Sequence, residues 1–398
     1  MGRSAFLGRP AAVARLQNIA KVGKLGQPLL MVGPEGAGKE NTALEFARLL
    51  NCSGGSGCGP ASLCESCVKA LSFQHPDIRW IGPAPATIKE ADIQGLFQEK
   101  MGNPFYQPPG AATSFVSIGD AEHPGQMTVR SVIQFLRKRA FQGRFKVAIV
   151  ADSQRMNTSA ANAFLKTLEE PPENTVIMLL STGTTGMLPT ILSRCQEMRF
   201  DPWPEDELTQ LLQDIGHVTA GEAQEAARIA DGNARRGLAL LQPETRVMAS
   251  WAVRLFEWIQ GGNQAMAAIS ADELHRGDVC HACLNEDLTQ KKLHAKVPSH
   301  RRDRAIQLCE LLNLVYSDVI SCRELGAQWR PRLAAGAAII EQAAVSRKTE
   351  SLLEDMAAIE ASRREVDRNI NIGLSMAVLF EELINRAVGD RIAVGGRA

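Results

Sequence analysis

The chain lacks a net charge, because its 44 lysine and arginine residues balance its 44 aspartate and glutamate residues. A balanced chain has no overall field that would draw it to nucleic acid, so any such contact must come from a local patch. Long apolar runs are also missing, since none approaches the roughly 18 residues of a membrane-spanning helix. The start, MGRSAFLGRP, has neither the apolar core of a signal peptide nor a myristoylation signal. We therefore expect a cytoplasmic protein without a membrane partner.

A disulfide framework is not expected either. The cysteines number nine, an odd count, in a large chain without a secretion signal. Four of them crowd one stretch in which glycine and serine permit tight turns: Cys52, Cys58, Cys64 and Cys67. Four thiolates can surround one ion tetrahedrally, so we predict a structural Zn²⁺ site. The alternative is a group of unligated thiols.

Two neighbouring patterns receive no metal role. His75 lies beyond the complete set of four cysteines and precedes Pro76, so we expect it to serve a turn. Cys280 and Cys283 form another C-x2-C pair, but no second pair lies nearby, and we treat this pair as incidental.

Residues 33–40 read GPEGAGKE, which nearly matches the phosphate-binding pattern G-x-x-x-x-G-K-[ST]. Gly33, Gly38 and Lys39 are in place. Glu40 stands where a Ser or Thr hydroxyl would ligate Mg²⁺. A carboxylate there would repel a triphosphate, and it could instead pair with Lys39 and neutralise it.

With 398 residues, the chain should hold two or three domains. Apolar runs bounded by loops predict three buried strands, at 28–33, 145–152 and 175–182. Helical spacing follows the first two of them. Strands that alternate with helices imply a parallel sheet covered on both faces. Residues 83–123 form a weakly periodic excursion from this domain, and beyond about residue 200 the periodicity is helical.

A second part of an ATP site would be an aspartate at a strand end, followed by an acid that activates water. Asp152 is present, but Ser153 follows it and has no evident base. Two altered motifs in one site predict a pocket that does not hydrolyse ATP. Nucleotide binding stays open, because Gly33, Gly38 and Lys39 remain.

The tract NTSAANAFLKTLEEPPENTVIMLLST (157–182), the later ILSRCQ (191–196) and a four-cysteine module after the phosphate-loop helix occur together. This set resembles the bacterial DNA polymerase III clamp loader family, over roughly residues 5–243. In that family, motor subunits have an intact phosphate loop and delta-prime subunits have a degraded one. Glu40 and Ser153 favour the delta-prime type.

The resemblance implies an AAA+ fold of three parts. The first is an α/β RecA-like parallel-sheet domain at 1–200, which carries the zinc module at 52–67. The second is a small helical lid at 201–243, and the third is an all-helical collar at 244–398. The implied partners are motor and delta subunits in a hetero-pentameric ring, with the sliding clamp and primed DNA reached through the complex.

The resemblance also implies roles for single residues. Arg194, in SRC, would be supplied in trans to the ATP of a neighbouring motor subunit, where a guanidinium can stabilise charge on the gamma-phosphate. Arg235 matches the second sensor arginine. Ser181 or Thr182 stands where the family places its first sensor. The bound group implied is structural Zn²⁺, and binding of ATP with Mg²⁺ in the chain's own site stays open.

A basic run, RKRAFQGR, contains Arg137, Lys138, Arg139 and Arg144. It is a candidate contact for the phosphates of template DNA, and a solvated helix face explains the same charges equally well.

Two other functions stay open at this point. One is an ATP-hydrolysing motor subunit of the same loader, with Glu40 tolerated. The other is an unrelated phosphate-loop enzyme such as a kinase, which would need an acceptor site and an intact metal pocket.

Overall fold

The computed structural model describes residues 8–22, 25–55, 58, 62–84, 88–107, 114–122, 125–276, 301–333, 336–367 and 371–395. The chain divides into two compact units, Met1–Leu238 and Ala239–Ala398. Cys280 and Cys283 lie outside the described residues, as does part of the 83–123 excursion.

The first unit is built on a parallel sheet of five strands in the order β2-β3-β4-β1-β5. The strands are β1 (Leu29–Val32), β2 (Ile78–Ile81), β3 (Lys146–Val150), β4 (Thr175–Ser181) and β5 (Gln196–Arg199). The central strands β3 and β4 are buried along their whole length, as expected for parallel strands covered on both faces. The α/β fold class predicted from the sequence is confirmed.

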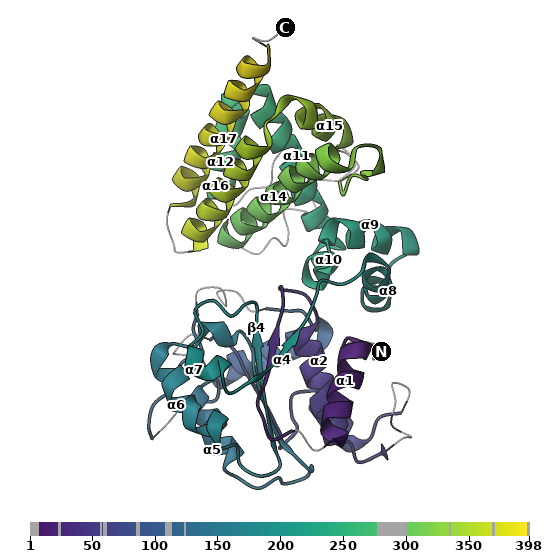
Figure 1. The fold of residues 1–398 in the computed structure, drawn as a ribbon, viewed down its shortest axis with the longest axis vertical. Coiled ribbons are helices and arrows are strands. Elements are labelled where there is room, and N and C mark those ends of the chain that lie inside the picture. Colours follow the sequence, from purple (N-terminus) through teal and green to yellow (C-terminus); the bar gives the residue numbers. More distant parts are fainter. Residues whose placement is uncertain are drawn as a thin grey trace. The chain divides into compact units, whose positions relative to one another are not determined.

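Helices cover the sheet from two sides (Figure 1). On one side lie α1 (Pro10–Lys21) and α2 (Lys39–Leu50), and on the other α5 (Val129–Leu136), α6 (Thr158–Glu169) and α7 (Pro189–Leu192). The Asn157 side chain caps α6 by accepting a hydrogen bond from the Ala160 N–H at 2.8 Å.

The remaining elements of this unit are shorter or follow the sheet. They are α3 (Glu65–Leu71), α4 (Glu90–Gly102), the 3₁₀ turn η2 (Ser153–Arg155), α8 (Glu205–Gly216), α9 (Ala220–Ala230) and α10 (Ala234–Leu240), whose end crosses the boundary between the units. A separate lid domain at 201–243 stays a prediction.

The second unit is helical throughout its described residues. Its elements are α11 (Pro243–Gly261), α12 (Gln264–Arg276), α14 (Arg301–Leu325), η4 (Gly326–Gln328), α15 (Ala337–Ser346), α16 (Thr349–Asp367) and α17 (Ile372–Gly395). The Arg347 guanidinium is fully buried and pairs with Asp355 at 2.5 Å and Asp390 at 2.9 Å. Because one buried guanidinium is shared between a carboxylate of α16 and a carboxylate of α17, these ion pairs fix how the two helices meet.

One segment of the described chain, Arg304–Gln328, is long and apolar enough to cross a membrane by length and composition. The expectation concerned uninterrupted apolar runs, and this segment contains Glu310 and Asp318. Its most apolar window is 56% buried within the helical unit, and the core helix of a protein outside membranes passes the same test. The segment is therefore weak support for a membrane span.

Candidate functional site

The phosphate loop joins β1 to α2 and turns through two glycines with positive φ, Gly36 at +72° and Gly38 at +83°. A side chain at Gly36 would also collide with Asn233, because a Cβ there would lie 1.9 Å from its Oδ1. The Gly36 carbonyl accepts hydrogen bonds from Trp203 Nε1 at 3.0 Å and from the Ala234 N–H at 3.2 Å. The loop is thus held against the segment that follows the sheet, a contact that the sequence did not reveal.

The Lys39 ammonium is turned back onto its own loop. Its Nζ donates to the carbonyl oxygens of Gly33 at 2.5 Å and Pro34 at 2.7 Å. Burial lowers the pKa of Lys39 to about 8, although the nearby carboxylates of Asp152 and Glu35 oppose that shift. The ammonium therefore already has acceptors where a working loop would hold it against phosphate oxygens.

We expected that Glu40 could pair with Lys39 and neutralise it, but the Glu40 carboxylate has another partner. Its Oε1 pairs with Lys100 Nζ at 2.7 Å, across sixty positions of sequence, and the Lys100 side chain is only 3% exposed. Lys100 also donates to the Tyr106 carbonyl at 2.9 Å and lies 4.8 Å from the centre of the Trp80 ring. Glu40 therefore anchors the segment after α4 to the phosphate loop.

That segment, residues 104–107, lines the pocket over the loop. Arg235 closes it further, because its Nη1 contacts the Glu35 carboxylate and donates to Gln107 Oε1 at 2.7 Å. The free volume is about 70 Å³, whereas pockets for nucleotide-sized ligands enclose roughly 300–1,000 Å³. In this structure the pocket has no room for ATP.

Beyond β3, a serine follows Asp152 where an acid would activate water. Asp152 has a left-handed backbone with φ of 47°, and burial, reinforced by nearby Glu35, raises the pKa of its carboxyl. The buried Ser153 hydroxyl donates to the Leu180 carbonyl at 3.0 Å. Of the two expected sensor positions, Ser181 is buried and donates to Gln154 Oε1 at 3.0 Å, while Thr182 lines the pocket.

The four predicted cysteines converge: their sulfur atoms all lie within 4.8 Å of one another. The Cys52–Cys64 and Cys58–Cys67 Sγ pairs are 3.9 Å and 3.4 Å apart. Tetrahedral Zn²⁺ with Zn–S bonds of about 2.3 Å places its sulfurs about 3.8 Å apart. The cluster can therefore hold a metal ion.

The surroundings of the cluster act differently on its thiols: burial raises the pKa of Cys52 and of Cys67, whereas the pKa of Cys64 is lowered. Burial opposes ionisation of Cys64, but hydrogen bonds from Ser53 and the Cys67 backbone lower the pKa of its thiol to about 5. Arg48 Nη1 donates to Cys67 Sγ at 3.0 Å. Its positive charge compensates part of the excess negative charge that four thiolates would bring to one divalent ion.

His75 is buried beside this module and has a structural role, as predicted. Its Nδ1 accepts the Asp77 N–H at 3.0 Å, and its Nε2 lies 3.0 Å from Ser66 Oγ. Burial lowers the pKa of the imidazole. The ring therefore joins the turn before β2 to α3 as a neutral group.

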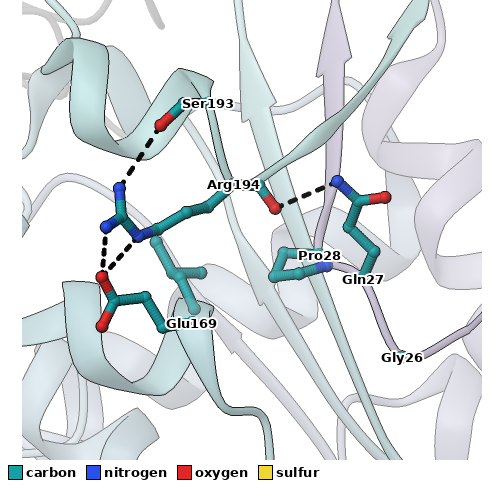
Figure 2. Close-up of a pocket in the computed structure, with 7 residues that line it drawn as sticks. Gly26, Gln27, Pro28, Glu169, Ser193 and Arg194 are labelled. Carbon is teal, nitrogen blue, oxygen red and sulfur yellow. Dashed lines mark hydrogen bonds and ion pairs between the residues drawn. The ribbon is translucent and has the colours of Figure 1, made fainter.

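Arg194 follows α7 and faces an open pocket of about 560 Å³ (Figure 2). Its Nε donates to Glu169 Oε1 at 2.7 Å, and its Nη2 contacts the same oxygen. Its Nη1 donates to the Thr190 carbonyl at 2.7 Å and to Ser193 Oγ at 3.3 Å, while Gln27 holds the Arg194 carbonyl at 3.3 Å. The guanidinium is thus oriented at a pocket edge and partly exposed, at 31%.

The basic run is exposed, in the connection between α5 and β3. The predicted cations Arg137, Lys138, Arg139 and Arg144 are all solvent-accessible. Between Arg139 and Arg144 stands Phe141, which is 86% exposed and which the sequence prediction did not single out.

Comparison with known proteins identifies the first unit. The family described as "DNA polymerase III, delta subunit" matches residues 8–204. These residues form a domain of that family. Subunit delta' of DNA polymerase III from Bacillus subtilis is 28% identical over 194 residues, which are 49% of this chain and 48% of that protein.

Other similar proteins carry a different subunit name. DNA polymerase III subunit gamma/tau from Mycobacterium bovis is 30% identical over 210 residues, or 52% of this chain and 30% of that protein. The chain thus spans about half or less of the length of these relatives. A DNA polymerase III gamma subunit-related protein from Thermotoga maritima has a solved structure with 16% identity and a TM-score of 0.41, covering 94% of this chain and 99% of that one.

Proposed function

We propose that the chain is a delta-prime-type subunit of the DNA polymerase III clamp loader, which does not hydrolyse ATP itself. It would assemble with motor and delta subunits in a five-membered ring that loads the sliding clamp onto primed DNA. The observation that carries this proposal is the phosphate-loop pocket, which has about 70 Å³ of free volume and is lined by Glu40, whose carboxylate pairs with Lys100. Relatives named delta' support it, and relatives named gamma/tau support the motor subunit as the second candidate.

In this proposal the chain contributes to catalysis through Arg194 rather than through its own loop. The guanidinium would enter the ATP site of a neighbouring motor subunit and stabilise charge on the transferred phosphoryl group. Its partial exposure and its place at the rim of an open pocket support that role. Glu169 then holds the arginine until a triphosphate replaces it as the anion.

A structural Zn²⁺ in the four-cysteine cluster is part of the same proposal. The sulfur separations and the low pKa of the Cys64 thiol support it. The cluster supplies no open coordination position for chemistry, so the metal would stabilise the fold around α2 and α3.

Nucleotide binding by the purified chain separates the two candidates. We expect neither Mg-ATP binding in a fluorescent-analogue titration nor hydrolysis. Lys39→Ala serves as the control for contaminating ATPases, since a contaminant's activity would survive that substitution. Turnover that Lys39→Ala abolishes would establish the motor subunit and overturn the delta-prime proposal.

Partners can be tested separately, by co-purification of the tagged full chain from its native cells. We expect DNA polymerase III clamp-loader subunits among the captured proteins. Their absence at native expression level would contradict the assembly proposed here.

A further inference from the structure

The connection between α5 and β3 presents an exposed aromatic ring within a cluster of positive charge. Phe141 is 86% exposed, more than any other large apolar side chain in the described part of the chain. Arg137, Lys138 and Arg139 precede it, and Arg144 follows it. We call residues 137–144 the aromatic-basic loop.

The charge of this loop is not compensated within the described structure. None of its four cations forms an ion pair or a side-chain hydrogen bond with another described residue. The sequence has no acidic residue between Glu122 and Asp152. The loop therefore stands out locally in a chain whose net charge is zero.

A buried carboxylate holds the loop rigidly. Asp77, which is 0% exposed, accepts hydrogen bonds from three successive backbone N–H groups, those of Phe141 at 2.8 Å, Gln142 at 2.7 Å and Gly143 at 2.6 Å. The same carboxylate pairs with Lys146 at 2.8 Å. These hydrogen bonds fix the backbone that carries the exposed Phe141 ring.

Asn51 fixes the other half of the loop. Its Oδ1 accepts the N–H groups of Arg144 and Phe145, both at 2.9 Å, and its Nδ2 donates to the Phe145 carbonyl at 3.0 Å. A side chain at Gly143 would collide with Asn51, since a Cβ there would lie 2.4 Å from Oδ1. The shape of the loop is therefore set before any ligand arrives.

The combination limits which ligands fit. An exposed phenylalanine ring leaves apolar surface in contact with water, which is unfavourable. A partner that covers the ring removes this surface from water, and the gain in free energy strengthens binding. Four exposed cations without a described counterion attract an anionic partner. An unpaired base with its phosphates offers both a flat apolar face and negative charge, which is how proteins bind single strands without reading sequence. A duplex offers the phosphates but hides the faces of its bases in the stack.

We propose that the aromatic-basic loop binds single-stranded DNA, with Phe141 stacked on an unpaired base and the flanking cations on phosphates. The choice of DNA and not RNA rests on the proposed function. The inference that a base stacks on Phe141 rests on the structure of the loop alone. An acidic peptide with an aromatic side chain is the competing occupant, and it is an outcome of the test.

The test measures binding of the purified full chain to fluorescently labelled oligo-dT of about 16 nucleotides, by anisotropy, beside a duplex of equal length. We expect the single strand to bind more tightly than the duplex. Loss of the stacked ring in Phe141→Ala should weaken single-strand binding roughly 5- to 150-fold. Phe141→Trp should restore it, whereas Phe141→Leu, which keeps apolar area without an aromatic face, should not. Phe115→Ala is the matched control, because Phe115 is also exposed, at 60%.

Salt dependence tests the cations. Each phosphate contact on a single strand contributes about −0.7 to the slope of log K against log salt, so removing three cations should reduce the slope by about 2. The variant is Arg137→Ala with Lys138→Ala and Arg139→Ala, and Arg364→Ala, an exposed arginine on α16, is its control.

Three outcomes would overturn the proposal: no measurable single-strand binding at low salt, equal effects of Phe141→Ala on single strand and duplex, or full rescue by Phe141→Leu. The first would leave an acidic peptide with an aromatic side chain as the occupant, and the last would indicate that apolar contact with the strand, not stacking on a base, accounts for the binding. None of these outcomes bears on the loader role, which depends on nucleotide binding and on Arg194.

Discussion

Glu40 is the residue at which the phosphate loop departs from the nucleotide-binding pattern that its glycines and Lys39 keep. In the sequence it is a defect, because a carboxylate replaces the hydroxyl that would ligate Mg²⁺. In the structure it has a partner, the nearly buried Lys100, at 2.7 Å. The ion pair joins the loop to the segment that lines the pocket, so the residue that replaces the hydroxyl also helps to hold that segment in place.

Replacing Glu40 should therefore not restore a nucleotide site. Reasoning from the motif alone, Glu40→Thr would recover Mg-ATP binding at most, without turnover. Because residues 104–107 still line a pocket of only about 70 Å³ and Lys100 loses its counterion, we instead expect no binding and a loss of about 1–3 kcal/mol of stability. Calorimetric titration with Mg-ATP and thermal melts measure the two effects. Glu65→Thr, in an exposed pair with Lys69, should change stability little, and tight ATP binding by Glu40→Thr would contradict the closed pocket.

At the scale of elements, the cysteine module links the end of α2 to α3. We predict about one Zn²⁺ per chain, since the four sulfurs lie at separations that suit tetrahedral coordination. Elemental analysis of protein purified without chelator measures the zinc content. Absence of zinc would contradict the assignment of the four cysteines as zinc ligands. Cys64→Ser should lower the melting temperature and the metal content together. Cys322→Ser, at a cysteine outside the cluster, should change neither.

The connection between α5 and β3 depends on Asp77. Burial would raise the pKa of its carboxyl, but the Gly143 N–H, Lys146 and the next N–H groups hold that pKa well below its ordinary value. A depressed folded pKa stabilises the protein above the unfolded pKa of about 3.9, and this contribution is lost as the pH falls below that value. The connection should therefore be among the acid-sensitive parts of the first unit.

Asp77→Asn tests this contribution. The substitution leaves the Lys146 ammonium, 7% exposed, without its counterion, so we expect a loss of about 2–5 kcal/mol at neutral pH. Urea unfolding at several pH values measures the free energy of unfolding of both proteins. The difference between the Asp77→Asn variant and the unmodified chain should shrink below about pH 4. A constant difference across that range would mean that the carboxylate charge is not the cause. Asp214→Asn, at an exposed aspartate of α8, is the control.

For the whole molecule, the sequence predicted those strands that a local pattern of apolar residues determines. The strands at 28–33, 145–152 and 175–182 correspond to β1, β3 and β4, because strands in the centre of a parallel sheet are continuous apolar runs. The edge strands β2 and β5 were missed: each has four residues, and β5 reads QEMR, which carries no apolar run.

The candidate sites also divide into those that the sequence predicted and those that it did not. The cysteine cluster was predictable because its ligands lie within sixteen positions of one another in sequence. The partner of Glu40, the contact of Gly36 with Asn233 and the support of Phe141 by Asp77 join residues far apart in the chain. Such contacts depend on how the elements pack, which no single-segment pattern contains.

The central claim is that the chain works on a neighbour's ATP and not on its own. The most direct measurement is the DNA- and clamp-stimulated ATPase of the assembled loader containing Arg194→Ala, at matched complex concentration. Loss of a trans arginine lowers turnover on the order of 10³–10⁵-fold at the site it serves, so the total rate should fall by at least that site's share. Arg194→Lys should rescue poorly, because an ammonium lacks the planar fork, and Arg199→Ala, an exposed arginine on β5, should behave as unmodified. If the Arg194→Ala complex assembles normally and hydrolyses ATP at the unmodified rate, the account is wrong.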